Sequence, residues 1–417
     1  MSLPLSDLFR VFTRIGLLSF GGPAAQIAVM HRELVEERPW LTEKQFLGAL
    51  SFCMLLPGPE AMQLATYAGW RLRGVPGGLI AGLLFVLPGA AVMMALVMLY
   101  AWLGTVPLVE ALFLGIKATV VVVVLQALLK VSRKALNSPD RWILAGLSFL
   151  AIFAFAAPFP AIIACAALYG AWAGGGIATV AATPTRPKTL QTIVTWAALW
   201  WAPVGLVWVL GLDRLLEVGL FFSKLAIVTF GGAYAVLAYM TQEVVQDHSW
   251  LTTAQMMDGL GLAETTPGPL ILVTQFVGYL AGLGAGGIGL AIAAALLTLW
   301  VTFTPCFLWI FAGAPYIEWI STRPRLTGAL SAITAAVVGV ILNLSLWFAT
   351  HVFFGTVGMF EVGPLRLLWP DPATLDARAL LLAVAAGVLL IGLNWGLVRV
   401  LALAAAAGAA LSLLGLA

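Results

Sequence analysis

The sequence predicts an all-α integral membrane protein, built from two homologous halves of inverted topology that contain re-entrant or broken helices. Three observations predict this fold class. Only 9% of the 417 residues are charged and 62% are hydrophobic, whereas a soluble domain carries about 25% charged residues. The apolar runs are long and continuous, as at 78–102 and 379–393, which favours helices over the short alternating segments of a β-barrel. The third observation is an internal repeat.

Short blocks of the first half recur in the same order in the second half. These blocks are FGG at 20–22 and 230–232, WLT at 40–42 and 250–252, and PGP at 57–59 and 267–269. Beyond PGP the offset changes from 210 to 217, so that Pro88 matches Pro305. Ordered matches at one offset indicate duplication. We therefore expect an N-terminal repeat at 1–180, a linker with one extra transmembrane helix at 181–212, and a C-terminal repeat at 213–417.

The basic residues indicate that the two halves are inserted with opposite polarity. Those of the first half gather after its PGP and in a later loop, at Arg71, Arg73, Lys130, Arg133, Lys134 and Arg141. The matching positions near 280–287 carry none, and basic residues return at Arg323 and Arg325. Because cytoplasmic loops are enriched in Lys and Arg, the pattern is inverted. The extra run at 193–211 supplies the odd crossing. Inverted repeats are typical of secondary transporters.

The stretch LLPGPE at 55–60 interrupts an apolar segment with two prolines and a glycine. The apolar runs 46–56 and 61–70 on either side are each about half the ~20 residues of a membrane span. Both outer ends carry basic residues, so both look cytoplasmic. We therefore expect 46–70 to form a re-entrant hairpin with PGP at its tip.

The repeat extends this prediction to the second half. A second hairpin at 256–279 is expected to enter from the opposite face. The segments GGP at 21–23 and GGA at 231–233 interrupt other apolar stretches. Whether these segments are two further hairpins or two broken spans stays open.

The breaks favour anion binding. Proline is common at the first position of a helix, so Pro23, Pro59 and Pro269 are expected to start short helices whose N-termini point to the membrane middle. Helix N-termini offer free N–H groups and a partial positive charge, which bind anions. Lipid tolerates broken backbone only where protein or a water-filled cavity covers it. The expected substrate-binding residues are Arg14, Gly21, Gly22, Pro23, Pro57, Gly58, Pro59, Gln63, Lys117, Lys224, Gly231, Gly232, Thr265, Thr266, Pro267, Gly268 and Pro269.

Three of these residues are basic. Arg14 and Lys224 occupy matched positions, each six residues before the phenylalanine of FGG, and Lys117 lies within the apolar stretch GIKATVVVVV. Charge inside a membrane is expensive and marks substrate or ion pathways. The alternatives are that Arg14 and Lys224 extend to the membrane interface and that Lys117 forms a structural ion pair.

Two carboxylates are candidates for proton coupling. Glu60 follows the first PGP, and Glu264 precedes the second. Either can titrate in a low dielectric, and either can instead cap a helix or pair with an arginine. The hydroxyls of Thr265 and Thr266 can bind a ligand or cap local backbone.

The sequence favours a transporter over an enzyme. It contains no phosphate-binding glycine-rich loop of the ATPase type and no catalytic triad pattern. Cys53, Cys165 and Cys306 have no metal-ligand or redox spacing. No cofactor, metal site or nucleic-acid partner is expected.

At these residues the sequence resembles the chromate transporter family, in its long form with two fused halves. The similarity lies in SFGGP (19–23), RPWLTEKQF (38–46), LLPGPEAMQLATYAGWRL (55–72), TFGGA (229–233), SWLT (249–252) and ETTPGPLILVTQFVGY (264–279). The resemblance implies export of chromate, a tetrahedral oxyanion like sulfate, and chromate resistance. It implies a multi-pass protein of the bacterial inner membrane. Ala233 and Leu270 stand where the first half has Pro23 and Glu60, so the halves are not expected to be functionally identical.

Three functions follow for testing. The first is a secondary active transporter of a tetrahedral oxyanion that exports chromate, with protons as the coupling ion. The second is uptake of sulfate or another oxyanion by the same machinery. The third is an intramembrane lipid-phosphate carrier or enzyme, which no His/Asp/Ser constellation supports. The expected partners are chromate or sulfate, membrane lipid and protons, and a homodimer stays open.

Overall fold

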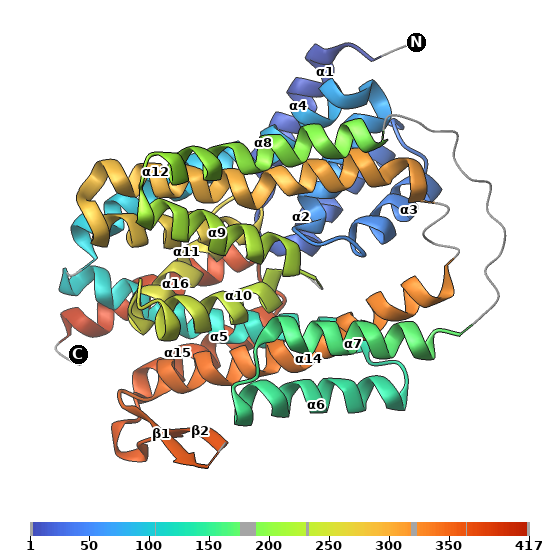
Figure 1. Cartoon of the computed structure of the whole chain (residues 1–417). Helices are drawn as coiled ribbons and strands as arrows, with labels where there is room; N and C mark the ends of the chain where they lie inside the picture. Colours follow the sequence, from blue (N-terminus) through green and yellow to red (C-terminus); the bar gives the residue numbers. More distant parts are fainter. Residues whose placement is uncertain are drawn as a thin grey trace. The chain divides into compact units, whose positions relative to one another are not determined.

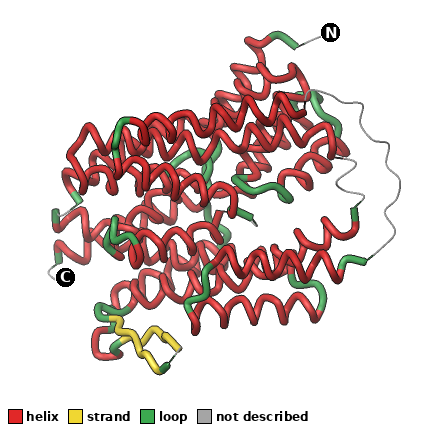
Figure 2. Tube along the Cα trace, in the orientation of Figure 1, coloured by secondary structure: helices red, strands yellow, loops and turns green. Residues whose placement is uncertain are grey.

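The computed structural model describes residues 3–104, 106–175, 189–230, 233–317, 323–363 and 365–414. Nearly all of these residues are helical, and one β-hairpin interrupts the helices (Figures 1 and 2). Among them, five helices are long and apolar enough to cross a membrane: Glu60–Leu103, Pro107–Ala135, Thr189–Val209, Leu270–Tyr316 and Pro324–Phe353. The prediction of a predominantly helical, multi-pass membrane protein is confirmed.

The helices of the two halves correspond in order. The first half contains α1 (Leu5–Leu18), α2 (Gly22–His31), α3 (Glu43–Cys53), α4 (Glu60–Leu103), α5 (Pro107–Ala135), α6 (Pro139–Phe155) and α7 (Phe159–Ala173). Helix α8 (Thr189–Val209) follows as the extra run. The second half contains α9 (Asp213–Val228), α10 (Ala233–Gln242), α11 (Thr253–Thr265), α12 (Val273–Gly313), α14 (Pro324–Phe353), α15 (Ala377–Gly387) and α16 (Leu397–Leu413). The antiparallel strands β1 (Val357–Val362) and β2 (Leu365–Pro370) lie between α14 and α15.

Helices α4 and α12 each contain two arms joined at a glycine. The helical backbone breaks at Gly74 (φ 63°, ψ −154°) in α4 and at Gly287 (φ 81°, ψ −172°) in α12. These φ values lie in the region that favours glycine. The arms then pack against each other. A side-chain carbon at Gly69 would overlap the backbone of Gly77, and one at Gly278 would overlap Thr298.

The chain forms two compact units. The first comprises Met1–Val97, Gly174–Val236 and Thr266–Thr327, and the second comprises Met98–Ala173, Leu237–Thr265 and Gly328–Ala417. Each unit therefore combines segments of both sequence halves. In the first unit, α8 and α9 lie along α12 (Figure 1). In the second, α5 lies against α15 and α16.

Helices of one half pack on helices of the other half in the second unit. Gly408 of α16 lies so close to the Ala111 carbonyl of α5 that a side-chain carbon there would overlap it. Helices α7 and α14 cross in the same way, because a side-chain carbon at Gly170 of α7 would overlap the Gly328 carbonyl of α14. Ala111 and Gly328 are matched at the offset of 217. The two crossings are thus reciprocal, and both depend on the absence of a side chain.

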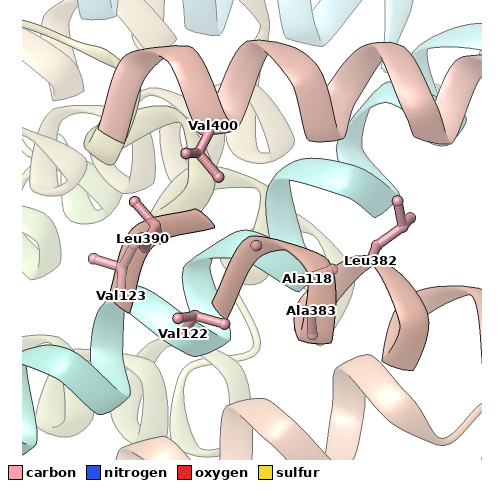
Figure 3. Close-up of a cluster of buried hydrophobic side chains, with 8 residues drawn as sticks. Ala118, Val122, Val123, Leu382, Ala383, Leu390 and Val400 are labelled. Carbon is pink, nitrogen blue, oxygen red and sulfur yellow. The ribbon is translucent and has the colours of Figure 1, made fainter. Parts of the chain in front are cut away.

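An apolar cluster fills the crossing of α5, α15 and α16 (Figure 3). Its buried members are Ala118, Val122, Val123, Leu382, Ala383, Ala386, Leu390 and Val400. The small and β-branched side chains let the helix backbones approach closely, as is usual for helices packed within a membrane.

His31 links α2 to α3 through two carboxylates, outside the five long apolar helices. Its Nε2 lies 2.7 Å from Glu43 Oε2, and its Nδ1 lies 3.0 Å from Glu36 Oε1. The hydrogen bond with Glu43 raises the pKa of His31 above 6.5, against the opposing effect of partial burial. Because the folded-state pKa is raised, this stabilisation is complete below the unfolded value and is lost as pH rises through the folded value.

We therefore expect the thermal unfolding midpoint of the wild type to exceed that of His31→Gln at pH ~6, and the difference to shrink by pH ~8. The measurement is thermal unfolding of purified protein in detergent at both pH values. A difference that is constant with pH would mean that His31 contributes only neutral hydrogen bonds.

Candidate functional site

The two PGP segments form tight, glycine-dependent turns in the first unit. Gly58 has φ +114° and Gly268 has φ +85°, values that L side chains rarely adopt. Helix α4 begins at Glu60, directly after Pro59. Pro269 precedes a 3₁₀ turn at Leu270–Leu272 that leads into α12. Helix α4 and the 3₁₀ turn therefore begin directly after Pro59 and Pro269, whereas the placement of their N-termini in the middle of the membrane stays a prediction.

The FGG segments are also breaks between helices. Helix α1 ends at Leu18 and α2 begins at Gly22, with Pro23 in its first turn. Gly21 and Gly22 have φ of +86° and +77°. In the second half, α9 ends at Val228 and α10 begins at Ala233. Gly231 and Gly232, also expected in the site, lie outside the described residues.

Each PGP turn binds the FGG break of the other half. The Gly58 N–H donates to the Thr229 carbonyl at 2.8 Å, and the Gly268 N–H donates to the Ser19 carbonyl at 2.8 Å. Ser19 and Thr229 are matched positions of the repeat, as are Gly58 and Gly268. The Ser19 hydroxyl donates to the Ile15 carbonyl at 2.6 Å, and Thr229 makes the equivalent bond to Leu225. The four breaks are therefore held together by a reciprocal pair of contacts.

Two buried glutamines secure the PGP turns. Gln63 Nε2 donates to the Pro57 carbonyl at 2.6 Å, and Gln26 Nε2 donates to the Gly268 carbonyl at 2.6 Å. Because each amide nitrogen faces a carbonyl, each Oε1 is left as an acceptor. Neither Oε1 has a hydrogen-bond partner among the described residues.

Further buried polar atoms of the same unit lack a hydrogen-bond partner within the described ranges. They are Gln275 Oε1, Ser223 Oγ and Thr302 Oγ1. Buried polar groups are nearly always hydrogen-bonded in proteins, and in a membrane interior they are costly. These atoms give the first unit an unused capacity to bind water or a polar ligand. Two of them are hydroxyls, which can donate hydrogen bonds to an anion, and the amide oxygens can accept hydrogen bonds.

Arg14 and Lys224 have exposed side chains in α1 and α9. Arg14 Nε lies 3.2 Å from Glu33 Oε1, and Arg38 binds the other oxygen of Glu33. The Glu33 side chain is fully buried, whereas that of Arg14 is 50% exposed. Arg14 therefore helps to neutralise a buried carboxylate.

Arg14→Gln should lower the free energy of unfolding by about 1–2 kcal/mol, less than the roughly 3–5 kcal/mol of a fully buried pair, because Arg38 still neutralises Glu33. The double variant Arg14→Gln/Glu33→Gln should recover this stability. If Arg14 also binds the transported anion, the double variant will regain stability but not transport. Thermal unfolding and vesicle flux of the same preparations separate the two roles. Recovery of both would make Arg14 purely structural.

Lys117 forms an ion pair in the second unit. Its Nζ lies 3.2 Å from Asp258 Oδ1 in α11, and the Tyr100 hydroxyl donates to Asp258 Oδ2 at 2.8 Å. The structural ion pair anticipated as an alternative for Lys117 is present. A contact between Lys117 and a substrate stays a prediction.

The remaining candidates lie at the start of α4 and around the second turn. Glu60 is half-buried as the first residue of α4, and Glu264 is buried in the last turn of α11. The Thr265 hydroxyl donates to the Leu262 carbonyl at 2.8 Å, which is the local capping anticipated as an alternative. Thr266 is buried. Within the described ranges, no group of three or more His, Cys, Asp or Glu side chains is placed to hold a metal ion.

Several residues of the site were missed at the sequence level. Ser19 and Thr229 could have been singled out from the sequence, because both are hydroxyl residues directly before FGG in the two halves. Asp258 could also have been singled out, as an acid within the apolar segment MMDGLGLA. Nothing in the sequence indicated Gln26, since its hydrogen-bond partner is 242 residues away.

The chromate transporter family profile matches residues 6–171 and 216–409, which is most of both halves. The chain belongs to the chromate transporter family. This family has a transport role rather than a catalytic one. A chromate transport protein of Pseudomonas aeruginosa is 32% identical over 374 residues, covering 86% of this chain and 85% of the relative. Another, from Cupriavidus metallidurans, is 30% identical and covers 81% of this chain and 80% of the relative.

A shorter relative matches only part of this chain. An uncharacterized transporter of Bacillus subtilis is 31% identical over 166 residues, which is 93% of that protein but 39% of this chain. One repeat length therefore corresponds to a complete protein in that organism. No solved structure matches the chain.

Proposed function

We propose that this protein is a secondary active transporter that exports chromate across the bacterial inner membrane and so confers chromate resistance. The observation that carries the proposal is the reciprocal pairing of the PGP and FGG breaks, which gathers two glycine-dependent turns and several unsatisfied polar atoms within one compact unit. Family membership supplies the substrate class, since relatives covering most of the chain are named chromate transport proteins.

The two halves are proposed to be inverted repeats. The reciprocal contacts, Gly58 with Thr229 and Gly268 with Ser19, are what a two-fold relation between matched elements produces. The same reciprocity occurs in the glycine crossings of Gly408 and Gly170. The reversal of basic residues between the halves supports an axis in the membrane plane. Such an arrangement supports alternating access around a fixed central site.

The proposed site binds the anion through backbone and hydroxyl donors rather than a dedicated cation. The first turns of α2 and α4 supply N–H groups, and the hydroxyls of Ser223 and Thr302 supply further donors. The unpartnered amide oxygens of Gln26 and Gln63 would accept hydrogen bonds from bound water or from the hydroxyl of the singly protonated oxyanion. Glu60 and Glu264 are proposed as proton-coupling candidates. We propose re-entrant geometry for 46–70 and 256–279.

Sulfate is the second candidate substrate, because it shares the size, charge and tetrahedral geometry of chromate. The experiment is uptake of labelled chromate into everted membrane vesicles, with and without a proton gradient, for wild type, Arg14→Gln and Lys224→Gln. Gradient-dependent accumulation by the wild type would support export. If chromate does not accumulate and labelled sulfate instead enters right-side-out vesicles, the function is uptake and chromate is an analogue.

A further inference from the structure

A buried ionic cluster in the second unit takes no part in the anion binding proposed above. Asp258 is 8% exposed and lies in α11, the residues of which are almost all buried from Met256 to Glu264. Its two oxygens have different partners: Lys117 of α5 lies 3.2 Å from Oδ1, and the Tyr100 hydroxyl of α4 donates to Oδ2 at 2.8 Å. Tyr100 also packs edge-on against Phe113 of α5, with ring centroids 5.5 Å apart.

The cluster is costly unless its charge serves a purpose. A charged pair withdrawn from water in a membrane protein is expensive even when the pairing is good. The matched positions of the repeat hold no such cluster, since Gly48 corresponds to Asp258 and Thr334 to Lys117. The cluster is therefore a feature of one half. It has not arisen from duplication of a structural element.

The position of Asp258 along the chain connects it to the second PGP turn. Helix α11 ends at Thr265, and the turn at 266–269 follows directly. Asp258 is seven residues before the end of α11 at Thr265, which corresponds to about 10 Å of helix rise. Helix α11 packs closely on α5, because Gly261 leaves room for Ile116. A change in the bond between Asp258 and Lys117 therefore acts directly on the packing of α11 against α5.

We propose that Asp258, Lys117 and Tyr100 form a proton-operated latch that holds α11 in place against α5; the inference rests on the proposed transport function. A proton from bulk water binds the Asp258 carboxylate and gives the neutral acid. The ion pair with Lys117 is then lost, α11 is released from α5, and the Lys117 ammonium needs a new counter-ion. Deprotonation re-forms the latch. Asp258 is thus a proton-binding residue, in addition to Glu60 and Glu264, that couples pH to the release of α11.

The other charged group near the latch is Glu110, which lies two turns before Lys117 on α5 and is exposed. Glu110 has the same charge as the Asp258 carboxylate, whereas Lys117 and the Tyr100 hydroxyl contact that carboxylate and stabilise its ionised form. Removing the Tyr100 hydroxyl should therefore let Asp258 bind its proton at higher pH. Phenylalanine has nearly the same shape, so Tyr100→Phe is a mild probe.

The test uses the full chain reconstituted in liposomes, with labelled chromate exchange measured between pH ~5.5 and ~8.5 at equal pH on both sides. We expect a wild-type profile with one midpoint, a flat profile for Asp258→Asn, and a midpoint about one pH unit higher for Tyr100→Phe, equivalent to a tenfold change in proton affinity. Glu110→Gln is the matched carboxylate control and should shift the midpoint far less, in the opposite direction.

A second readout does not depend on the substrate. Hydrogen exchange of the peptide 253–265, corrected for the intrinsic effect of pH, should rise in the wild type as pH falls, and should be high at every pH in Asp258→Asn. A wild-type exchange profile in Asp258→Asn, or an unshifted midpoint in Tyr100→Phe, would overturn the latch. If the exchange results hold but no chromate moves, the proposed substrate fails and the latch stands.

Discussion

Replacing Gly58 with alanine should reduce chromate transport per molecule in the membrane by about tenfold or more, the effect of roughly 1.4 kcal/mol on the rate-limiting barrier. Two features cause the loss. The φ of +114° is unfavourable for any residue with a side-chain carbon. An alanine carbon would also lie 2.9 Å from both Cys306 Sγ and Gln63 Nε2. The turn must then shift and weaken its bond to the Thr229 carbonyl. The measurement is flux into everted vesicles, normalised to protein content.

Gly48→Ala is the control for this prediction. Gly48 lies in the neighbouring helix α3, and a side-chain carbon there would meet no atom within 4 Å. Alanine is favoured over glycine inside a helix by roughly 0.5–1 kcal/mol, so this variant should keep normal flux. Normal flux in Gly58→Ala, at a normal amount in the membrane, would show that the first PGP turn is not part of the transport machinery.

The breaks in the helices could be predicted from sequence because they follow local rules. Glycine adopts left-handed φ and proline stops or starts a helix wherever they occur, so Gly58, Gly268 and Pro23 revealed their conformation without a structure. The helix starts at Thr42 and Thr252 are equally local, since in each a glutamine three residues on completes a capping box. The repeat itself needed only ordered matches.

The partners across the chain could not be predicted in this way. The bonds of Gly58 to Thr229 and of Gln26 to Gly268 join residues that are far apart in sequence. A single sequence records which residues are matched between halves, but not that each half packs on its counterpart. The apolar pattern is also uninformative inside a membrane, because lipid-facing and buried helix faces are both apolar. Glycines mark several helix crossings, but only the structure shows which glycines lie at a crossing.

The charged residues illustrate the same limit. Arg14 and Lys117 were each singled out because charge in an apolar segment is expensive, and the structure places both beside a carboxylate. The cost was recognised from sequence, but the identity of the neutralising group was not. Asp258 is separated from Tyr100 by 158 residues. The free-energy cost of placing a charge in an apolar segment therefore identifies such residues in a sequence. Only the folded structure shows which residues neutralise them.

Gly408→Ala should produce a large loss of stability in the second unit. An added carbon would overlap the Ala111 carbonyl of α5, so α16 must move away from α5 and loosen the packing around Val400 (Figure 3). Overpacking of this kind costs about 1–3 kcal/mol, opposite in sign to the usual gain from glycine to alanine in a helix. The measurement is the thermal midpoint of the purified protein in detergent, from the soluble fraction that remains after heating.

Two further variants determine how this loss is interpreted. Gly146→Ala in α6 is the control, since a carbon there would meet no atom within 4 Å, and its midpoint should equal or exceed that of the wild type. Gly170→Ala tests the reciprocal crossing of α7 and α14. Equal midpoints for Gly408→Ala and Gly146→Ala would mean that the α5–α16 crossing tolerates a methyl group. Similar losses at Gly408 and Gly170 would make the two crossings energetically equivalent. A loss at Gly408 alone would show that the halves match in geometry while one crossing carries more of the stability.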